Sequence, residues 1–558
     1  MKTKNIIYFL ALAAAGTFTS CKKNYLDIVP TDRVPDVAVA ADSALFQDYV
    51  LNRYMSIKLQ DKEGEGTNPG FGRGFEYAMW SSVTDESIYN NDDNTWLIQK
   101  GLLAPENTGI AGTIWGRSYR SIRECNYGLS IIGKVQMSDQ LKNRLRGELH
   151  FIRAYRYQDL IRNYGGVVLV KDTVYALENN LTDPSLFVKS SLADCIKYAV
   201  AELDSAAYFL PQVNDGNWQQ GRATKGAALA LKSRLLLYAA SPLYNVGTWA
   251  DAAAAAKVVM DMNQYALAAD YSKLFINASA SSSEIIFSRQ YAIGARHVCL
   301  EISNGANGYG GWAGNTPLQN LVDAYEMNNG KTITDPASTF DPAKPYANRD
   351  ARFYATILYN GALYRGDTIK TYRPGGKDGI DGPSNWNSTK TGYYLRKFMD
   401  DNNPIDNPWN VAGLQPWIYL RYAEVLLNYA EAQNEAVGPD ATVYAAINLI
   451  RQRASVNQPA LVAGLSQSEM RTAIMRERQV ELAFEEHRFY DVRRWRIAST
   501  TENTPAYGVD VTLVNGAPVY TQKVALTGRL FNEKNYWLPI PRTEIQASNN
   551  QLLQTVGY

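Results

Sequence analysis

The chain has 558 residues, of which 46% are hydrophobic and 20% charged, an ordinary globular composition that can bury a large core and argues against extensive disorder. Its formal net charge of +1, without a block of Lys and Arg, argues against a nucleic-acid partner. The four cysteines and three histidines show no CxxC or HExxH spacing, so we expect neither a metal site nor a cofactor. The 37 Tyr and 11 Trp exceed what is usual, and some of these rings are available for binding.

The N-terminus carries the features of a bacterial export signal. Lysines precede an apolar run over residues 6–15, which is too short to span a bilayer but typical of a signal-peptide core. The run is followed by Phe-Thr-Ser-Cys21, and small residues before such a cysteine resemble a lipobox. We therefore expect residues 1–20 to be a lipoprotein signal peptide and Cys21 to carry the lipid anchor. The alternative is a plain secretory signal with an incidental cysteine.

Helical patterns dominate the next part of the chain. The segments RGELHFIRAYRYQDLIRNY and KGAALALKSRLLLYAASPLYN combine a stripe of large apolar residues with small residues and an aromatic near the helix end. LRYAEVLLNYAEAQNEA, much later in the chain, repeats this pattern. Three such segments, each next to a second helix, indicate tetratricopeptide-like helix pairs, although their period is irregular.

The run from Ile418 to Trp495 predicts three consecutive helical segments, LRYAEVLLNYAEAQNEA, VYAAINLIRQRA and EMRTAIMRERQVELAFEEHRFYDVRRW. Gly438-Pro439 ends the first and begins the second. In the third, one face is apolar and the other carries charges at spacings of three and four that can form a ladder of ion pairs, namely Arg478, Glu481, Glu485 and Arg488. We interpret this ladder as structural rather than catalytic.

A polar loop with interleaved aromatic residues, EYAMWSSVTDESIYNNDDNTWLIQKG, follows a glycine-rich stretch. The C–H face of a sugar ring packs on an aromatic ring while its hydroxyls bind Asn and Asp, so this composition suits a glycan site. Tyr89, Asn94 and Trp96 are the candidate ligand residues. Trp80 precedes the polar run and is predicted to lie in the core.

A second candidate loop, NGANGYGGWAGNTP, holds Tyr309 and Trp312. No apolar periodicity surrounds Trp312, so nothing local predicts its burial, and the glycines allow the backbone to approach a ligand closely. The loop lacks the GxGxxG spacing and the downstream acid of a nucleotide site. Trp386, in the insert-like segment GGKDGIDGPSNWNS, is a further candidate.

Several of these segments together resemble the SusD/RagB family of surface glycan-binding lipoproteins. The resemblance rests on the helical run from Ile418, on RERQVELAFEEHRFYDVRRW, on the ending YWLPIPRTEIQASNNQLLQTVGY and on the lipoprotein-like start. It implies a mostly α fold, with a tetratricopeptide-like helical scaffold and a loop-rich, partly β variable region. We expect an N-terminal helical part over residues 21–280 and a C-terminal part over 281–558. The latter divides into a variable region at 281–410 and a helical core at 415–500, and both parts should form one compact unit.

The resemblance also implies a function. A protein of this family is lipid-anchored at the outer membrane, faces the cell exterior, captures an oligosaccharide or polysaccharide and delivers it to a SusC-like TonB-dependent transporter; it is not an enzyme. A RagB-type protein that takes up peptides is one alternative. A glycoside hydrolase is another, with its paired carboxylates drawn from Asp85, Glu86, Asp92 and Asp93. Acids in a polar loop are usually solvated, which favours the binding protein.

Overall fold

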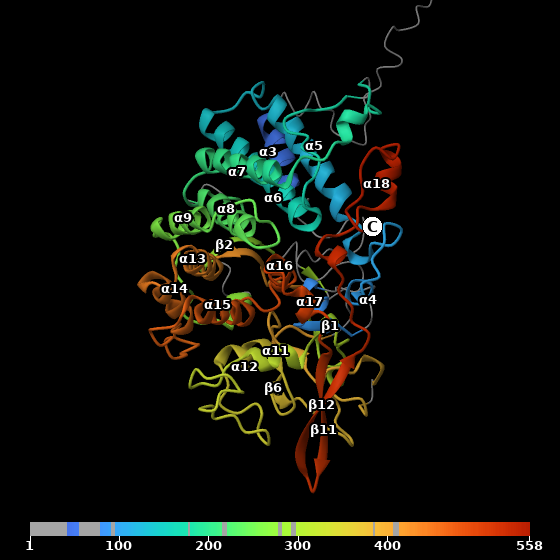
Figure 1. Ribbon diagram of the computed structural model, residues 1–558, viewed down its shortest axis with the longest axis vertical. Helices are drawn as coiled ribbons and strands as arrows, with labels where there is room; N and C mark the ends of the chain where they lie inside the picture. Colours follow the sequence, from blue (N-terminus) through green and yellow to red (C-terminus); the bar gives the residue numbers. More distant parts are fainter. Residues whose placement is uncertain are drawn as a thin grey trace, which may run out of the picture.

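The computed structural model describes residues 42–54, 79–90, 95–176, 179–214, 220–276, 282–291, 297–298, 300–382, 385–405 and 412–558. Cys21 and Asn94 fall outside these ranges, as do Asp92 and Asp93, so the predictions for these residues lie outside the described part of the chain. Helices dominate the described residues, and the predicted mostly α fold is confirmed (Figure 1).

The N-terminal part is a stack of helices in which each packs against the next. α3 (Ser43–Arg53) lies against the start of a series that continues with α5 (Ile114–Ile131), α6 (Asp139–Tyr164), α7 (Leu192–Phe209), α8 (Lys225–Ala240) and α9 (Trp249–Asp261). Four of these helices begin at a Ser or Thr whose hydroxyl accepts a backbone N–H three residues on, Ser138, Ser191, Thr224 and Thr248. Local capping therefore defines where each helix starts.

The C-terminal helices extend the same stack. α13 (Tyr422–Val437) packs against α8 and α9, and α14 (Ala441–Arg451) and α15 (Gln467–Glu481) pack against α13 (Figure 1). Gly438, with φ of +97°, ends α13, and the Asp440 side chain caps α14, so the predicted break at Gly438-Pro439 is confirmed. The scaffold is thus assembled from two stretches of sequence far apart in the chain.

The third predicted helical segment is in fact two helices, and the single-helix prediction is wrong there. α15 ends at Glu481 and α16 (Arg488–Arg494) begins after a tight turn. In that turn Phe484 and Glu486 have φ of +62° and +66°, which a continuous helix cannot contain. The turn directs Glu485 to the buried Arg421 and Lys397, and these ion pairs compensate for the strain of the turn.

The middle of the chain is loop-rich, with short helices and antiparallel strand pairs. β2 (Ile285–Arg289) pairs with β10 (Trp417–Arg421), which leads directly into α13. The other short elements are β1 (Ser87–Tyr89), α4 (Thr95–Gln99), β3 (His297–Val298), α10 (Leu300–Asn304), β4 (Asn315–Pro317), α11 (Gln319–Ala324), α12 (Ala351–Thr356), β5 (Ile357–Leu358), β6 (Leu363–Tyr364), β7 (Asp367–Thr368), β8 (Tyr394–Leu395) and β9 (Ala412–Gly413).

A long hairpin near the C-terminus was not predicted. β11 (Ala506–Val514) and β12 (Ala517–Leu526) are joined by Asn515-Gly516, both at positive φ, as a two-residue hairpin turn requires (Figure 1). The hairpin follows α17 (Ala498–Thr501), and the last helix of the chain is α18 (Arg542–Ala547).

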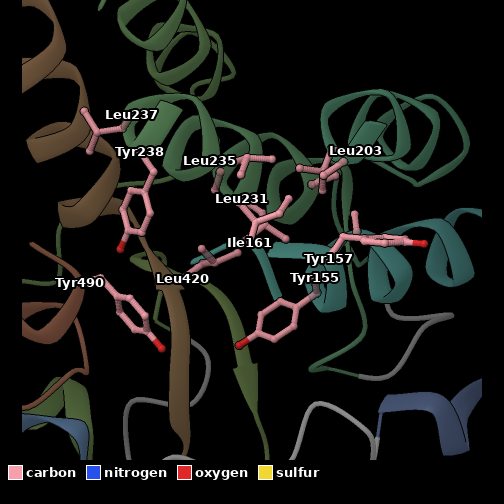
Figure 2. Close-up of a cluster of buried hydrophobic side chains, with 14 of the residues drawn as sticks. Tyr155, Tyr157, Ile161, Leu203, Leu231, Leu235, Leu237, Tyr238, Leu420 and Tyr490 are labelled. Atoms are coloured by element: carbon pink, nitrogen blue, oxygen red, sulfur yellow. The ribbon is translucent and has the colours of Figure 1, made fainter. Parts of the chain in front are cut away.

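The largest hydrophobic cluster fills the helical stack and includes residues from both parts of the chain. Figure 2 shows its centre, where Tyr155, Tyr157 and Ile161 of α6 lie near leucines of α8, with Leu420 of β10 alongside. Trp80 is fully buried, with its ring centroid 4.4 Å from that of Phe489, which confirms its predicted core position.

Buried ion pairs connect the C-terminal helices to the middle region. The Arg421 guanidinium contacts Glu284 and Glu481 at 2.8 Å and Glu485 at 2.6 Å, and Arg453 contacts the same Glu284 and Glu481. Burial alone would raise the pKa of Glu481, but the surrounding guanidinium groups hold it below its usual value. The charged face of the third segment therefore forms ion pairs with other elements, rather than the predicted ladder along one helix.

Candidate functional site

The two aromatic loops singled out from the sequence meet through a strand pair. β1 and β4 are antiparallel, with Ser87 opposite Pro317 and Tyr89 opposite Asn315. Because β4 directly follows the glycine-rich loop and β1 lies within the first polar loop, this short pairing brings the two loops side by side. The Asn90 N–H extends the contact by donating to the Gly314 carbonyl at 2.7 Å.

Asn90 also binds a third segment, the insert that carries Trp386. Its side-chain N–H donates to the Ser388 carbonyl at 2.9 Å, and its side-chain oxygen accepts the Lys390 N–H at 3.0 Å. Asn90 is buried, and sequence reasoning did not select it as a site residue. Its position beside Tyr89 in an Asn- and Asp-rich run was the available signal, but its main-chain partners could not be identified from the sequence.

Trp312 is partly buried, it packs against Ile302 as does Ile405, and the main-chain N–H of Trp312 donates to the Ile302 carbonyl at 2.7 Å. The sequence pattern gave no reason for this packing, because both isoleucines lie outside the glycine-rich run. Gly305 and Gly311 lie against each other with no room for a Cβ on either. These two glycines therefore serve the packing of the loop on itself, in contrast to the expected approach to a ligand.

Tyr309 lies in the same loop but has a covered ring. Its hydroxyl donates to the Tyr364 carbonyl at 3.2 Å, and its ring meets that of Tyr364 edge to face at 5.0 Å. The Lys377 ammonium lies 3.9 Å from the ring centroid and is held by Asp367 at 2.9 Å. In this arrangement the Lys377 ammonium covers one face of the Tyr309 ring.

The other predicted residues differ widely in exposure. Tyr89 is 4% exposed, and its ring packs close to Gly314 of the glycine-rich loop. Trp386, in a short turn of 3-10 helix, is 74% exposed. Trp96, on α4, is partly buried against the main hydrophobic cluster, with the Lys100 ammonium 5.7 Å from its ring. Strand pairing and the hydrogen bonds of Asn90 thus join the segments of Tyr89, Tyr309, Trp312 and Trp386, while Trp96 packs towards the helical core.

Two buried carboxylates, Asp85 and Glu86, lie in the first polar loop. Asp85 makes a bidentate pair with Arg488, the first residue of α16, at 2.8 and 2.7 Å. Burial alone would raise its pKa, but Arg488 holds it below the usual value. Burial raises the pKa of the adjacent Glu86, which is 1% exposed, to about 8. The expectation that these acids are solvated is therefore wrong for both residues.

Another buried carboxylate lies under the second loop. Asp378 is fully buried, accepts the Lys370 N–H at 2.8 Å and lies against Gly308, and burial raises its pKa to about 6.

Among the described residues, no cluster of His, Cys, Asp or Glu is suited to hold a metal ion. In the same part of the chain, no helix is both long and apolar enough to cross a membrane.

The sequence matches two family models and many solved structures. The model described as "SusD family" matches residues 274–558, and one described as "Starch-binding associating with outer membrane" matches residues 27–237. SusD-like protein P2 of Formosa agariphila is 25% identical over 464 residues, covering 81% of this chain and 82% of its own length.

Among solved structures, a SusD-like protein from Bacteroides fragilis matches with a TM-score of 0.77 and 30% identity, covering 95% of this chain and 100% of that one. A SusD-like carbohydrate binding protein from the same species gives a TM-score of 0.76 and 27% identity, with coverage of 92% and 99%. The family matches span both parts of the chain, and the C-terminal one alone covers just over half of it. The protein therefore belongs to the SusD family.

Proposed function

We propose that this protein is a lipid-anchored receptor on the outer face of the outer membrane, which captures an oligosaccharide or polysaccharide and passes it to a SusC-like TonB-dependent transporter. Membership of the SusD family supports this proposal, as does the description of one matching family model as starch-binding and associated with the outer membrane. The lipobox-like sequence before Cys21 supports the anchor.

The observation that carries the proposal is the meeting of three loops at Asn90. These loops carry Trp312, which is partly buried, and Trp386, which is highly exposed. Exposed aromatic rings held by a buried polar contact provide a preformed surface for the apolar face of a sugar. Trp96 belongs to the same polar loop and is proposed as a more distant ring of the site.

The geometry favours binding over hydrolysis. A glycoside hydrolase needs two carboxyl groups facing the same bond across an open cleft. Asp85 is fully engaged by Arg488, and Glu86 is buried beside it, so neither can reach a sugar. We therefore propose that the protein holds its glycan without cleaving it.

The helical scaffold is the proposed docking surface for the transporter. In Figure 1 helices α5 to α9 form one end of the molecule, while β1 and the hairpin lie towards the other end. The division leaves extended helical faces free for a partner while the loops engage the glycan.

Affinity electrophoresis and calorimetry against a panel of polysaccharides test the proposal, with reducing ends measured in the same samples. We expect binding to at least one glycan and no steady release of reducing ends. Binding to unstructured peptides with no binding to any glycan would instead support the RagB-type alternative. Reducing ends that form at a steady rate, in proportion to protein, would contradict the non-catalytic role.

A further inference from the structure

A mostly apolar cavity of about 290 Å³ lies on the helical scaffold, apart from the loops of the proposed glycan site. Its size is close to the lower end of the range of roughly 300–1,000 Å³ for small-ligand pockets. In Figure 1 the C-terminal helix α18 lies beside α5. The cavity is partly open to solvent and is lined by residues of these two helices, of the chain that follows α6 and of the chain after α18. Its walls include Trp115, Tyr119, Val168, Leu181, Phe187 and Glu544.

The aromatic wall of the cavity is held rigidly. The ring of Trp115 lies 5.0 Å from Tyr119 and meets Tyr164 edge to face at 5.0 Å. The Tyr119 hydroxyl donates to the Val168 carbonyl at 3.0 Å, which joins α5 to the chain after α6. A ligand would therefore meet rings that are already in place, at little cost in conformational entropy.

Glu544 is the only ionisable carboxylate among the lining residues. Among the residues that the structure describes, no hydrogen-bond donor or cation pairs with its carboxylate, and burial is the cause that raises its pKa. The group lies against α5 at Gly116, where a Cβ would come within 2.9 Å of Oε1. The absence of a side chain at Gly116 thus gives the carboxylate its place beside Trp115.

A half-buried carboxylate without a counter-ion, next to aromatic rings and aliphatic side chains, has the chemistry of a site for an organic cation. The carboxylate supplies a charge-assisted hydrogen bond, ring faces attract the positive charge, and the aliphatic walls hold an apolar stem. Among the lining residues, Leu181 is an exposed apolar side chain, with 42% of its surface accessible.

We propose that this cavity binds a primary ammonium group carried on an apolar stem, with Glu544 as its counter-ion and Trp115 and Tyr119 as its aromatic wall. The same chemistry is offered by a lysine side chain of a partner protein and by a free amine. Neither the glycan site nor its loops take part in this binding.

The test compares phenethylammonium with 2-phenylethanol, a neutral molecule of similar shape, by ligand-observed NMR and calorimetry on the purified protein at pH 8 and low salt. The ammonium compound is expected to bind about tenfold more tightly than the alcohol, because only the cation pairs with Glu544. In Glu544→Gln this preference should vanish while weak binding of both compounds remains. Equal binding of the two compounds to the unaltered protein, or binding of neither, would overturn the proposal.

Two further variants separate the pocket from general effects. Gly116→Ala places a methyl group where the carboxylate lies and should weaken ammonium binding while alcohol binding is retained. Glu533→Gln changes an exposed glutamate that pairs with Arg496 and should leave the preference intact. A preference that persists in Glu544→Gln, or that is lost in Glu533→Gln, would contradict the assignment.

Two peptides distinguish the source of the ammonium group, N-acetyl-Leu-Lys-amide and N-acetyl-Leu-norleucine-amide. Binding of the lysine peptide but not of the norleucine peptide indicates a lysine of a partner protein. Binding of the free amine with no binding of either peptide indicates a small molecule.

Discussion

The Asn90 side chain donates to the main-chain carbonyl of Ser388 at 2.9 Å and joins two positions 298 residues apart in the chain. Its amide oxygen accepts the Lys390 N–H at 3.0 Å, so one buried side chain fixes both ends of a short stretch of the insert. Trp386 lies two residues before Ser388. The exposed ring of the proposed glycan site is thus positioned by a residue that does not itself face the ligand.

Asn90→Ala should weaken glycan binding several-fold and lower the free energy of unfolding by about 1–3 kcal/mol, because the Ser388 carbonyl and the Lys390 N–H lose their buried partner. Calorimetry and thermal melting measure the two effects. Asn329→Ala, in an exposed turn, is the matched control and should change neither quantity measurably. Unchanged affinity in Asn90→Ala would show that the insert does not contribute to the site.

Glu86 gives the protein a defined pH dependence. Burial raises the pKa of Glu86 from its ordinary value of 4.5 to about 8 in the folded state, so the folded state binds the proton more tightly. Above about pH 8 Glu86 is ionised and lowers the free energy of unfolding by its full amount. As the pH falls from 8 towards 4.5, the free energy of unfolding rises by about 1.4 kcal/mol per pH unit.

Glu86→Gln should remove this contribution, since an amide does not titrate. The difference in unfolding free energy between this variant and the unaltered protein should grow as the pH rises from 6 to 8. Chemical denaturation at pH 6, 7 and 8 measures it, with both proteins sharing all other titrating groups. A difference that stays constant over this range would contradict a proton held by Glu86.

Arg478 is expected to stabilise the fold without affecting ligand binding. Its guanidinium contacts Asp491 at 3.2 Å and the Asn428 side chain at 2.8 Å, and it is fully buried. Arg478→Ala leaves a buried carboxylate with one fewer partner and should cost about 3–5 kcal/mol of stability. Arg476→Ala on the same helix removes a side chain that is 33% exposed and should cost less than about 1 kcal/mol. Loss of glycan affinity in Arg478→Ala at a temperature well below its melting point would contradict this assignment.

Cys21→Ala should release the protein from the membrane without changing its melting temperature, because the substitution removes only the proposed lipid-acceptor thiol. Fractionation in cells that lack the transporter excludes retention by docking. Persistence of the variant in the washed outer-membrane fraction would show that another feature holds the protein there.

Much of the scaffold could be predicted because its signals are local. The apolar stripes, the Ser and Thr caps and the Gly438-Pro439 break define α13 and α14 without reference to the rest of the chain. The Asn515-Gly516 turn was an equally local signal for the hairpin of β11 and β12, flanked by alternating apolar residues, and could have been used.

The features that were missed depend on distant contacts. The end of α15 is set by the requirement that Glu485 reach Arg421, a residue 64 positions earlier, and no helical pattern records this. Asp85 was predicted to be a solvated acid of the polar loop, because its partner Arg488 is 403 positions away in the chain. Likewise, Trp312 packs on Ile302, outside the glycine-rich loop, and Asn90 binds main-chain groups that a sequence does not identify.

In the proposed site, the aromatic rings on these loops bind the glycan. Trp386 is the sharpest single probe, because its 74% exposure means that removing it should barely affect stability. Trp312 is partly packed on isoleucines, so its removal should cost some stability, but less than the roughly 3–5 kcal/mol of a fully buried tryptophan. Tyr208→Ala, on α7 and 82% exposed, is the control for loss of an exposed ring and should bind normally.

The most direct measurement is the glycan affinity of Trp312→Ala, Trp386→Ala and the Trp96→Ala, Trp312→Ala double variant, with the melting temperature recorded on the same preparations. An exposed ring that stacks on a sugar contributes on the order of 1–2 kcal/mol, so each single change should reduce affinity by about five- to thirty-fold and the double change should abolish weak binding. All three variants should still unfold cooperatively. Full affinity in both single variants and in the double variant would contradict the proposed site.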